Sequence, residues 1–371
     1  MKNTWVLNKP TLTLVSLALL AASACGDDTE TTGGGGAGAT GGGGSGGGTG
    51  GDGGVGATGG MGGTGGAPNG GGGSGGAGIE VNPSANDDGA FTTPFDATPS
   101  PDGTTLYFTA YEVATGDAAV FSKAADGSGS ISTLHAGAPL AGPFGIATSN
   151  DGNLLYIADP AAVLDAADEG DPTKGVLFTM SMSGGAPSVV SGSAGFAPRG
   201  IEVASDDVAF FSGKDPSGVP GVFEVGAGAV SALVSGSPFV DPSGIAIAAD
   251  GRIFVADTSE GEGVSRVFLV DVNDEVSIFL DNLTVGYPVG LALSADDSTL
   301  YVSLVDPTDT TSAVGIVDVA TQSLTLFNDG IGMNDDSGGL HRAKNTNTFA
   351  WAGPTAGATK SGTIYTITVN D

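Results

Sequence analysis

The sequence of 371 residues contains few of the residue types on which several common classes of function depend. Cys25 is the only cysteine, which excludes a disulfide within the folded part and leaves its stability to packing. Only 11 Lys and Arg accompany 41 Asp and Glu, giving a net charge of -30. This balance argues against a nucleic-acid partner, because phosphate binding needs clustered cations. With two histidines in all, His135 and His341, a Ser-His-Asp triad is not expected.

Positive charge, a short apolar run and the single cysteine occur together at the N-terminus. Lys2 and Lys9 accompany an apolar stretch over residues 11–22, a combination typical of a signal peptide. The apolar run is shorter than the roughly 20 residues that span a bilayer. Small residues follow in the segment Ala-Ser-Ala-Cys that ends at Cys25.

This N-terminal segment resembles the bacterial lipoprotein signal. The resemblance implies that residues 1–24 are a signal peptide, that the thiol of Cys25 is acylated, and that the lipid anchors the protein to a membrane of the bacterial cell envelope. Ala22 stands where that family prefers Leu, and ordinary secretion with an unmodified Cys25 is the alternative. Gly26 replaces the aspartate that retains some lipoproteins in the inner membrane, which favours the outer membrane and a periplasmic or surface-exposed protein.

A glycine-rich segment follows the cysteine. From residue 33 to residue 78, 30 of the 46 positions are glycine. Such a composition cannot bury enough apolar surface to offset the entropy lost on ordering. We therefore predict that residues 25–78 are a flexible tether, spanning on average roughly 35–40 Å.

Six similar segments follow within residues 79–371. Four contain a Pro-x-Gly motif, which is Pro-Phe-Asp at residues 94–96 in the first segment and Ser-Gly-Gly at residues 337–339 in the last. An aromatic or apolar strand follows about ten residues later in each. The aligned positions recur at spacings of 44 to 55 residues and are Asp96, Gly145, Gly200, Gly244, Gly290 and Gly339. Turn pairs such as Asp102-Gly103 separate the first two strands, and two further apolar runs follow in each unit. The period and the absence of helical periodicity predict an all-β, six-bladed propeller with four-stranded blades.

The last repeat ends at its third strand, near the C-terminus. A fourth strand can come from Ile79, Glu80 and Val81, upstream of the first repeat. This exchange predicts a ring that is closed by an N-terminal strand, which removes exposed sheet edges.

Residues 242–257, with the sequence PSGIAIAADGRIFVAD, resemble the NHL repeat and the related gluconolactonase-type six-bladed propellers. The resemblance implies a divalent metal on the axis and metal-dependent lactone hydrolysis, to which Asp96 and Glu202 would contribute. Residues 92–94 are Thr-Thr-Pro where that family has Glu-Gly-Pro. Where a liganding Asn follows Pro in the family, this chain has Phe144, Arg199, Ser243 or Val289.

Both ends of the repeated motif are expected at one face of the ring, because its two strands are antiparallel neighbours. The candidate ligand-binding residues there are Asp96, Phe144, Arg199, Glu202, Ser243 and His341. Arg199 could clamp a carboxylate or a phosphate, or form a salt bridge to Glu202 or Asp96. His341 could act as a base or a metal ligand, or be a packed, hydrogen-bonded side chain.

Acidic side chains gather in the connections between second and third strands. Asp165, Asp168, Glu169 and Asp171 form a loose cluster that could hold a divalent cation such as calcium, although they lack the EF-hand spacing; a solvated acidic loop is the alternative. The sequence favours a monomeric, non-enzymatic propeller that binds an unknown protein or small-molecule ligand. A diverged gluconolactonase-like hydrolase is the alternative, and the sequence does not decide between them.

Overall fold

The computed structural model describes residues 78–86, 89–162, 164, 175–226, 228–258, 265–308, 310–328, 331, 338–355 and 361–370. The predicted signal peptide, Cys25 and the tether up to residue 77 lie outside the described residues. So do the four acidic side chains considered for calcium, Asp165, Asp168, Glu169 and Asp171. In the described part of the chain every regular element is a strand, and no helix there has the length and hydrophobicity that crossing a bilayer requires.

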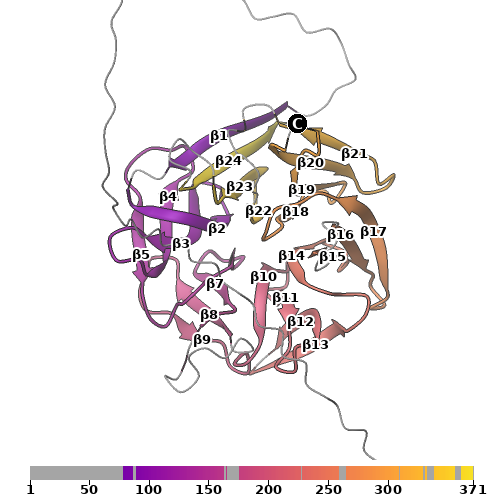
Figure 1. Cartoon of the computed structure of the whole chain (residues 1–371), viewed down its shortest axis with the longest axis horizontal. Helices are drawn as coiled ribbons and strands as arrows, with labels where there is room; N and C mark the ends of the chain where they lie inside the picture. Colours follow the sequence, from indigo (N-terminus) through magenta and orange to yellow (C-terminus); the bar gives the residue numbers. More distant parts are fainter. Residues whose placement is uncertain are drawn as a thin grey trace, which may run out of the picture. The chain divides into compact units, whose positions relative to one another are not determined.

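The strands form six antiparallel sheets of four strands each, the blades of a propeller (Figure 1). Blade one contains β2 (Phe91–Pro99), β3 (Thr105–Glu112), β4 (Ala118–Ala124) and β5 (Ser132–Ala136). Blade two contains β6 (Gly145–Thr148), β7 (Leu154–Asp159), β8 (Val176–Ser181) and β9 (Ser188–Val189). Blade three contains β10 (Ala197–Val203), β11 (Ala209–Lys214), β12 (Pro220–Gly226) and β13 (Ala229–Ser235).

The remaining three blades repeat this order. Blade four contains β14 (Pro242–Ile247), β15 (Ile253–Thr258), β16 (Ser265–Val270) and β17 (Val276–Leu283). Blade five contains β18 (Leu291–Leu293), β19 (Thr299–Val305), β20 (Ser312–Asp318) and β21 (Leu324–Phe327). Blade six contains β22 (Leu340–Arg342), β23 (Thr348–Gly353), β24 (Thr363–Asn370) and β1 (Gly78–Asn86). The predicted six-bladed architecture is confirmed.

The two ends of the propeller's chain close the ring. β1 pairs with β24, with Ile79 opposite Val369 and Val81 opposite Ile367. The predicted N-terminal strand therefore supplies the fourth strand of the last blade (Figure 1). Because β1 and β24 come from opposite ends of the propeller, this pairing ties its first residues to its last.

Hydrophobic clusters lie between the blades. Each of the six clusters combines residues of two neighbouring blades, as with Phe91 and Phe108 of blade one and Ile364 of blade six. The same arrangement recurs at every junction round the ring. Trp351 and ten phenylalanine or leucine side chains are among the largest fully buried groups. Burial of apolar surface thus holds each blade to the next one.

The innermost strands of neighbouring blades contact one another round the axis. The repeated glycines explain how they come so close. A Cβ atom added to one of these glycines would lie under 3.0 Å from a backbone atom of the next blade: Arg199 O for Gly145, Ser243 O for Gly200, Val289 O for Gly244 and Leu340 N for Gly290. Asp96 replaces the glycine in blade one, and a Cβ on Gly339 would collide with its carboxylate.

The ring has two distinct faces. Pro242, at the start of β14, pairs with Asp257, near the end of β15, so both ends of the repeated motif lie at one face, as expected. We call this the loop face, because the connections between second and third strands leave it. The opposite face carries the turns between first and second strands, for example residues 248–252, and is called the hairpin face.

Candidate functional site

The axial side chains come from the position two residues after the repeated glycine. Three blades have alanine there, Ala147, Ala246 and Ala292, and all three side chains are buried. The equivalent residues in blades three and six are Glu202 and His341. Because side chains alternate along a strand, this position shares the face of the glycine, the face turned to the next blade. Alanines thus leave room at the axis, and two ionisable side chains extend into it.

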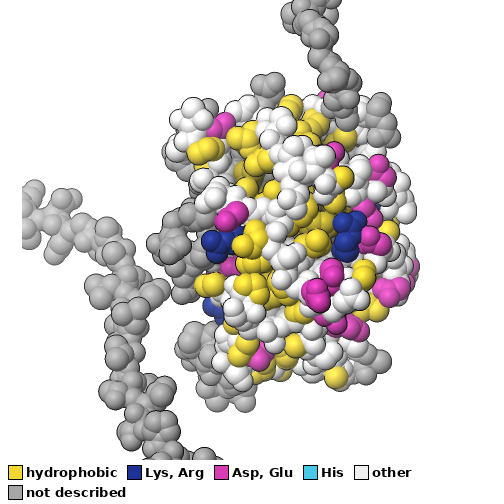
Figure 2. Space-filling model, turned by 90° about the vertical axis from the view of Figure 1, so that its right-hand side faces the viewer, with side chains coloured by type: hydrophobic (Ala, Val, Ile, Leu, Met, Phe, Trp, Pro, Cys, Tyr) yellow, Lys and Arg dark blue, Asp and Glu magenta, His cyan; other side chains and the backbone are white. Residues whose placement is uncertain are grey.

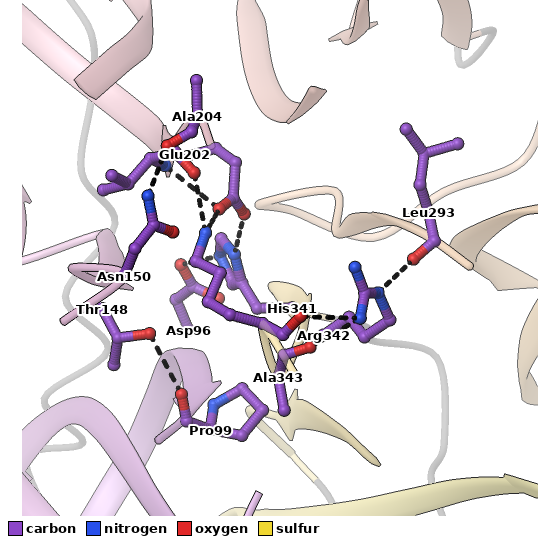
Figure 3. Close-up of polar contacts among 12 residues, drawn as sticks. Asp96, Pro99, Thr148, Asn150, Glu202, Ala204, Leu293, His341, Arg342 and Ala343 are labelled. Atoms are coloured by element: carbon purple, nitrogen blue, oxygen red, sulfur yellow. Dashed lines mark hydrogen bonds and ion pairs between the residues drawn. The ribbon is translucent and has the colours of Figure 1, made fainter. Parts of the chain in front are cut away.

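His341 joins two carboxylates at the axis (Figure 3). Its Nε2 lies 3.0 Å from Oδ2 of Asp96, and its Nδ1 lies 2.9 Å from Oε2 of Glu202. The side chains of His341 and Asp96 are 6% and 4% exposed, and that of Glu202 is 15% exposed. Both ring nitrogens carry a proton when imidazole donates to two carboxylates, so His341 is an imidazolium ion in this arrangement.

Both carboxylates also accept hydrogen bonds from other donors. Asp96 accepts the backbone N–H of Ala97 at Oδ1, at 2.8 Å, and that of Ile146 at Oδ2, at 2.9 Å. Glu202 accepts the ammonium group of Lys344 at Oε1, and this ammonium also donates to the carbonyl of Val203 at 2.8 Å. The axis therefore contains a chain of alternating charges, Asp96, His341, Glu202 and Lys344, contributed by blades one, three and six.

Opposite charges determine the protonation states in this axial charge chain. Burial by itself would lower the pKa of His341, but the charge of Asp96 and hydrogen bonds to both carboxylates raise it to about 10. Burial would raise the pKa of Glu202, whereas the charge of Lys344 and the bonds from His341 hold that pKa far below its usual range. His341 is thus protonated and Glu202 is ionised at neutral pH.

A cavity of about 330 Å³ opens beside this charge chain on the hairpin face. Glu202, Lys344, Arg342 and Asp297 provide its charged groups, and Asn150 and Asn345 provide neutral polar ones. Much of its remaining wall is alanine, contributed by Ala204, Ala246, Ala248, Ala249, Ala292 and Ala295. The size lies at the lower end of the range for small-molecule sites, which are concave and carry a few placed polar groups.

On the loop face, Arg199 lies among aromatic rings. Its guanidinium carbon is 5.7 Å from the ring centre of Phe144 and 5.1 Å from that of Tyr287, within cation–π range. Phe144 also stacks on Phe95, with ring centres 4.9 Å apart. The expected salt bridge from Arg199 to Glu202 or Asp96 is wrong. Arg199 instead pairs with Asp241, at 3.4 Å.

Asp241 takes Arg199 because it lies on the same face, whereas Glu202 and Asp96 already bond His341. The carboxylate of Asp241 also pairs with Lys214 at 3.1 Å and accepts the hydroxyl of Tyr287 at 3.3 Å. Ser243 is buried, and its hydroxyl accepts the backbone N–H of Val289 at 3.4 Å, which links blades four and five. The cavity between these residues and His341 measures about 10 Å³, room for about one water molecule.

The six predicted site residues thus form two groups. Asp96, Glu202 and His341 meet in the axial charge chain, while Phe144, Arg199 and Ser243 line the loop face. Lys344 and Arg342 line the axial cavity on the hairpin face and were not predicted from the sequence. Aligning the repeats through their turns would have found Lys344, since it occupies the position of Asn150, Ala249 and Ala295, which also line the cavity.

The carboxylates considered for lactone hydrolysis do not face a common point. Asp96 and Glu202 approach opposite nitrogens of the same imidazolium ring, which leaves His341 no lone pair for a metal. Among the described residues, no three His, Cys, Asp or Glu side chains are arranged to hold a metal ion. The clustered acidic side chains of residues 165–171 fall outside that description.

Comparison with known proteins shows the fold and no more. No family model and no curated protein matches this chain. Among solved structures, AofleA from Arthrobotrys oligospora is similar over 76% of this chain and 83% of its own, with a TM-score of 0.51 and 10% identity. TolB from Acinetobacter baumannii is similar over 62% of this chain, with a TM-score of 0.48 and 15% identity, and the matched part spans 53% of the TolB chain.

A catalytically inactive virginiamycin B lyase from Staphylococcus aureus, crystallised with quinupristin, is also similar. The match covers 78% of this chain and 99% of the lyase, with a TM-score of 0.47 and 13% identity. The match to AofleA, with a TM-score of 0.51, supports the fold, while the site must be argued from its own residues.

Proposed function

We propose that this protein is a cell-envelope lipoprotein that presents a monomeric β-propeller as a ligand-binding module. Residues 1–24 are the signal peptide, Cys25 carries the lipid, and the glycine-rich segment up to residue 78 holds the propeller away from the membrane. The outer membrane is the proposed site of the anchor. The support for this part is the N-terminal sequence: a positively charged start, a short apolar run and small residues before a single cysteine.

The ligand binds in the axial cavity of the hairpin face. The observation that carries this proposal is the cavity of about 330 Å³ whose inner end contains bonded, charged side chains. Glu202 and Lys344 are fixed by their bonds within the charge chain, so these polar groups are already in position when a ligand binds. Preorganised polar groups cost little further ordering on binding. Binding agrees with this geometry better than metal-dependent lactone hydrolysis does, because Asp96 and Glu202 are bonded to His341.

Replacing Cys25 with serine is expected to release the protein from the membrane fraction of cells that process bacterial lipoproteins. Without a thiol, no acyl group can be attached, and a tether of this composition has no affinity for lipid. Labelling with radioactive palmitate followed by membrane fractionation measures both effects. Ser23→Ala is the matched control and should remain labelled and membrane-bound. Equal membrane binding by the Cys25→Ser protein would contradict the lipoprotein proposal.

Filling the mouth of the cavity is expected to abolish ligand binding. Ala249 and Ala295 line the cavity and are exposed, so tryptophan at both positions adds bulk there without disturbing the core. Saturation-transfer NMR with lactate, benzoate, lactamide, benzamide, glucose and glycine should detect binding to the wild-type protein. The double tryptophan variant should lose at least about tenfold in affinity for whichever probe binds.

Ala114→Trp supplies the control for this experiment, because Ala114 is exposed on the loop face, away from the cavity. Its affinity should equal that of the wild-type protein. Two outcomes would overturn the axial site: no probe binds the wild-type protein, or the double variant binds as tightly as the wild type. A ligand displaced by Ala114→Trp alone would place binding on the loop face instead.

A further inference from the structure

Arg342 is fixed at the cavity by backbone carbonyl groups. Its Nε donates to the carbonyl of Leu293 at 2.8 Å, and its Nη1 donates to that of Ala343 at 2.7 Å (Figure 3). Nη1 also donates to the carbonyl of Thr346 at 3.1 Å. No described residue accepts a hydrogen bond from Nη2, and Arg342 lines the cavity. The guanidinium group is thus held in place with one nitrogen left for another partner.

Other arginines of this protein are paired with carboxylates. Arg252 binds Asp250 at 2.7 Å and Arg266 binds Asp281 at 2.9 Å, and Figure 2 shows basic side chains on the outer surface with acidic ones beside them. Arg199 pairs with Asp241. Arg342 has only carbonyl groups as direct partners among the described residues. The charges of Glu202 and Asp297 act on Arg342, but neither carboxylate is bonded to it.

The charges that line the cavity balance before any ligand binds. Lys344 and Arg342 are positive, and Glu202 and Asp297 are negative. Glu202 is neutralised within the charge chain by His341 and Lys344. Asp297 accepts the backbone N–H of Ala249 at 2.7 Å and lies at the rim, in the turn between β18 and β19. Among the described residues of the lining, Arg342 is the one cation without a bonded carboxylate, so it can match the charge of a monoanion, whereas a dianion would bring two negative charges to this single free cation.

We propose that the axial cavity binds a small organic monoanion through its carboxylate. The carboxylate accepts from Nη2 of Arg342, and the third N–H of the Lys344 ammonium remains to assist, since the other two are bonded to Glu202 and Val203. The apolar part of the ligand packs against the alanine wall, and Asn150 and Asn345 supply neutral hydrogen-bonding groups. This inference rests on the proposed function, because it names the ligand class of the same cavity.

Isothermal titration of the full chain in detergent with matched pairs of probes tests the proposal. The pairs are lactate with lactamide and benzoate with benzamide, which differ in charge and little in shape; inorganic phosphate represents the dianion. At least one carboxylate should bind about tenfold more tightly than its amide, and Arg342→Gln should remove about tenfold or more of that affinity. Arg266→Gln, which removes a surface arginine from β16, is the matched control and should bind as the wild type does.

Arg342→Lys serves as the second variant, because it keeps the positive charge and loses the planar guanidinium group. Thermal melts establish that each variant is folded. The lysine variant should bind the carboxylate more weakly than the wild type does. The proposal is overturned when the amide binds as tightly as the acid, when phosphate binds more tightly than either carboxylate, or when no carboxylate binds the wild-type protein. The amide could also bind to the Arg342→Gln protein and fail to bind to the Ala249→Trp and Ala295→Trp double variant. That result would contradict an anionic ligand and still support the axial cavity as the binding site.

Discussion

Replacing His341 with leucine is expected to lower the free energy of unfolding by about 3–5 kcal/mol, the cost typical of breaking a buried ion pair from one side. The substitution leaves Asp96 and Glu202 close to the axis without the imidazolium between them. Glu202 keeps Lys344, whereas Asp96 keeps only backbone N–H donors among the described residues. Chemical denaturation followed by tryptophan fluorescence measures the loss.

The pH dependence of stability distinguishes this role from simple packing. The pKa of His341 is raised from an ordinary value of 6.5 to about 10, so its stabilising contribution is complete below pH 6.5 and is lost as the pH rises through 10. The pKa of Glu202 is lowered, so its contribution is present above about pH 4.5 and is lost as the pH falls. Stability of the wild-type protein should therefore be greatest between about pH 4.5 and 6.5.

His135→Leu is the control for both measurements, because His135 is partly exposed on β5 and bonds only the carbonyl of Ala138 among the described residues. It should change stability by less than about 0.5 kcal/mol and keep the decline between pH 8 and 10. In His341→Leu that decline should be much weaker. A His341→Leu protein as stable as the wild type would contradict the charge chain as described.

Gly244→Ala is expected to destabilise the protein by about 3 kcal/mol, the upper end of what overpacking costs. The new methyl group would lie under 3.0 Å from the backbone carbonyl oxygen of Val289 in the next blade. That oxygen is on the backbone, so it cannot move aside as a flexible side chain would, and blades four and five must separate. Thermal and denaturant unfolding give the magnitude.

Gly226→Ala provides a matched glycine substitution at the end of β12. The closest atom to a Cβ there is the carbonyl oxygen of Ala229 at 3.5 Å, an ordinary van der Waals distance, and the residue is exposed. This variant should be within about 0.5 kcal/mol of the wild type. If Gly244→Ala were equally mild, the close approach of the innermost strands would not require the repeated glycine.

Much of the fold could be predicted from the sequence because each blade consists of contiguous residues, so its strands and turns recur as a pattern along the chain. The Pro-x-Gly motif and the Asp-Gly turns lie within 60 residues of their equivalents in the next repeat, and four strands per repeat follow from local apolar runs. Even the closure by Ile79 and Val81 was predictable, because the last repeat lacks a strand and the residues upstream of the first repeat can supply it.

The site was predicted less well. Asp96, Glu202 and His341 were found because the repeated motif places them on the innermost strands, around the axis. Their partners could not be assigned, and Arg199 was matched to the wrong carboxylate. Asp241 lies outside the repeated positions from which the candidate residues were chosen. Its proximity to Arg199 depends on how the loop before β14 folds.

The sequence by itself determined the number of blades, the closing strand and the two faces of the ring, because these follow from local periodicity and from antiparallel neighbours. Only the tertiary structure decided which charges meet at the axis. His341 lies 139 residues from Glu202 and 245 residues from Asp96 along the chain, and they come within hydrogen-bonding distance only because the ring closes. The tertiary structure also shows that the larger of the two axial cavities, about 330 Å³, opens on the hairpin face. The alanines of blades four and five leave space there that no single repeat reveals.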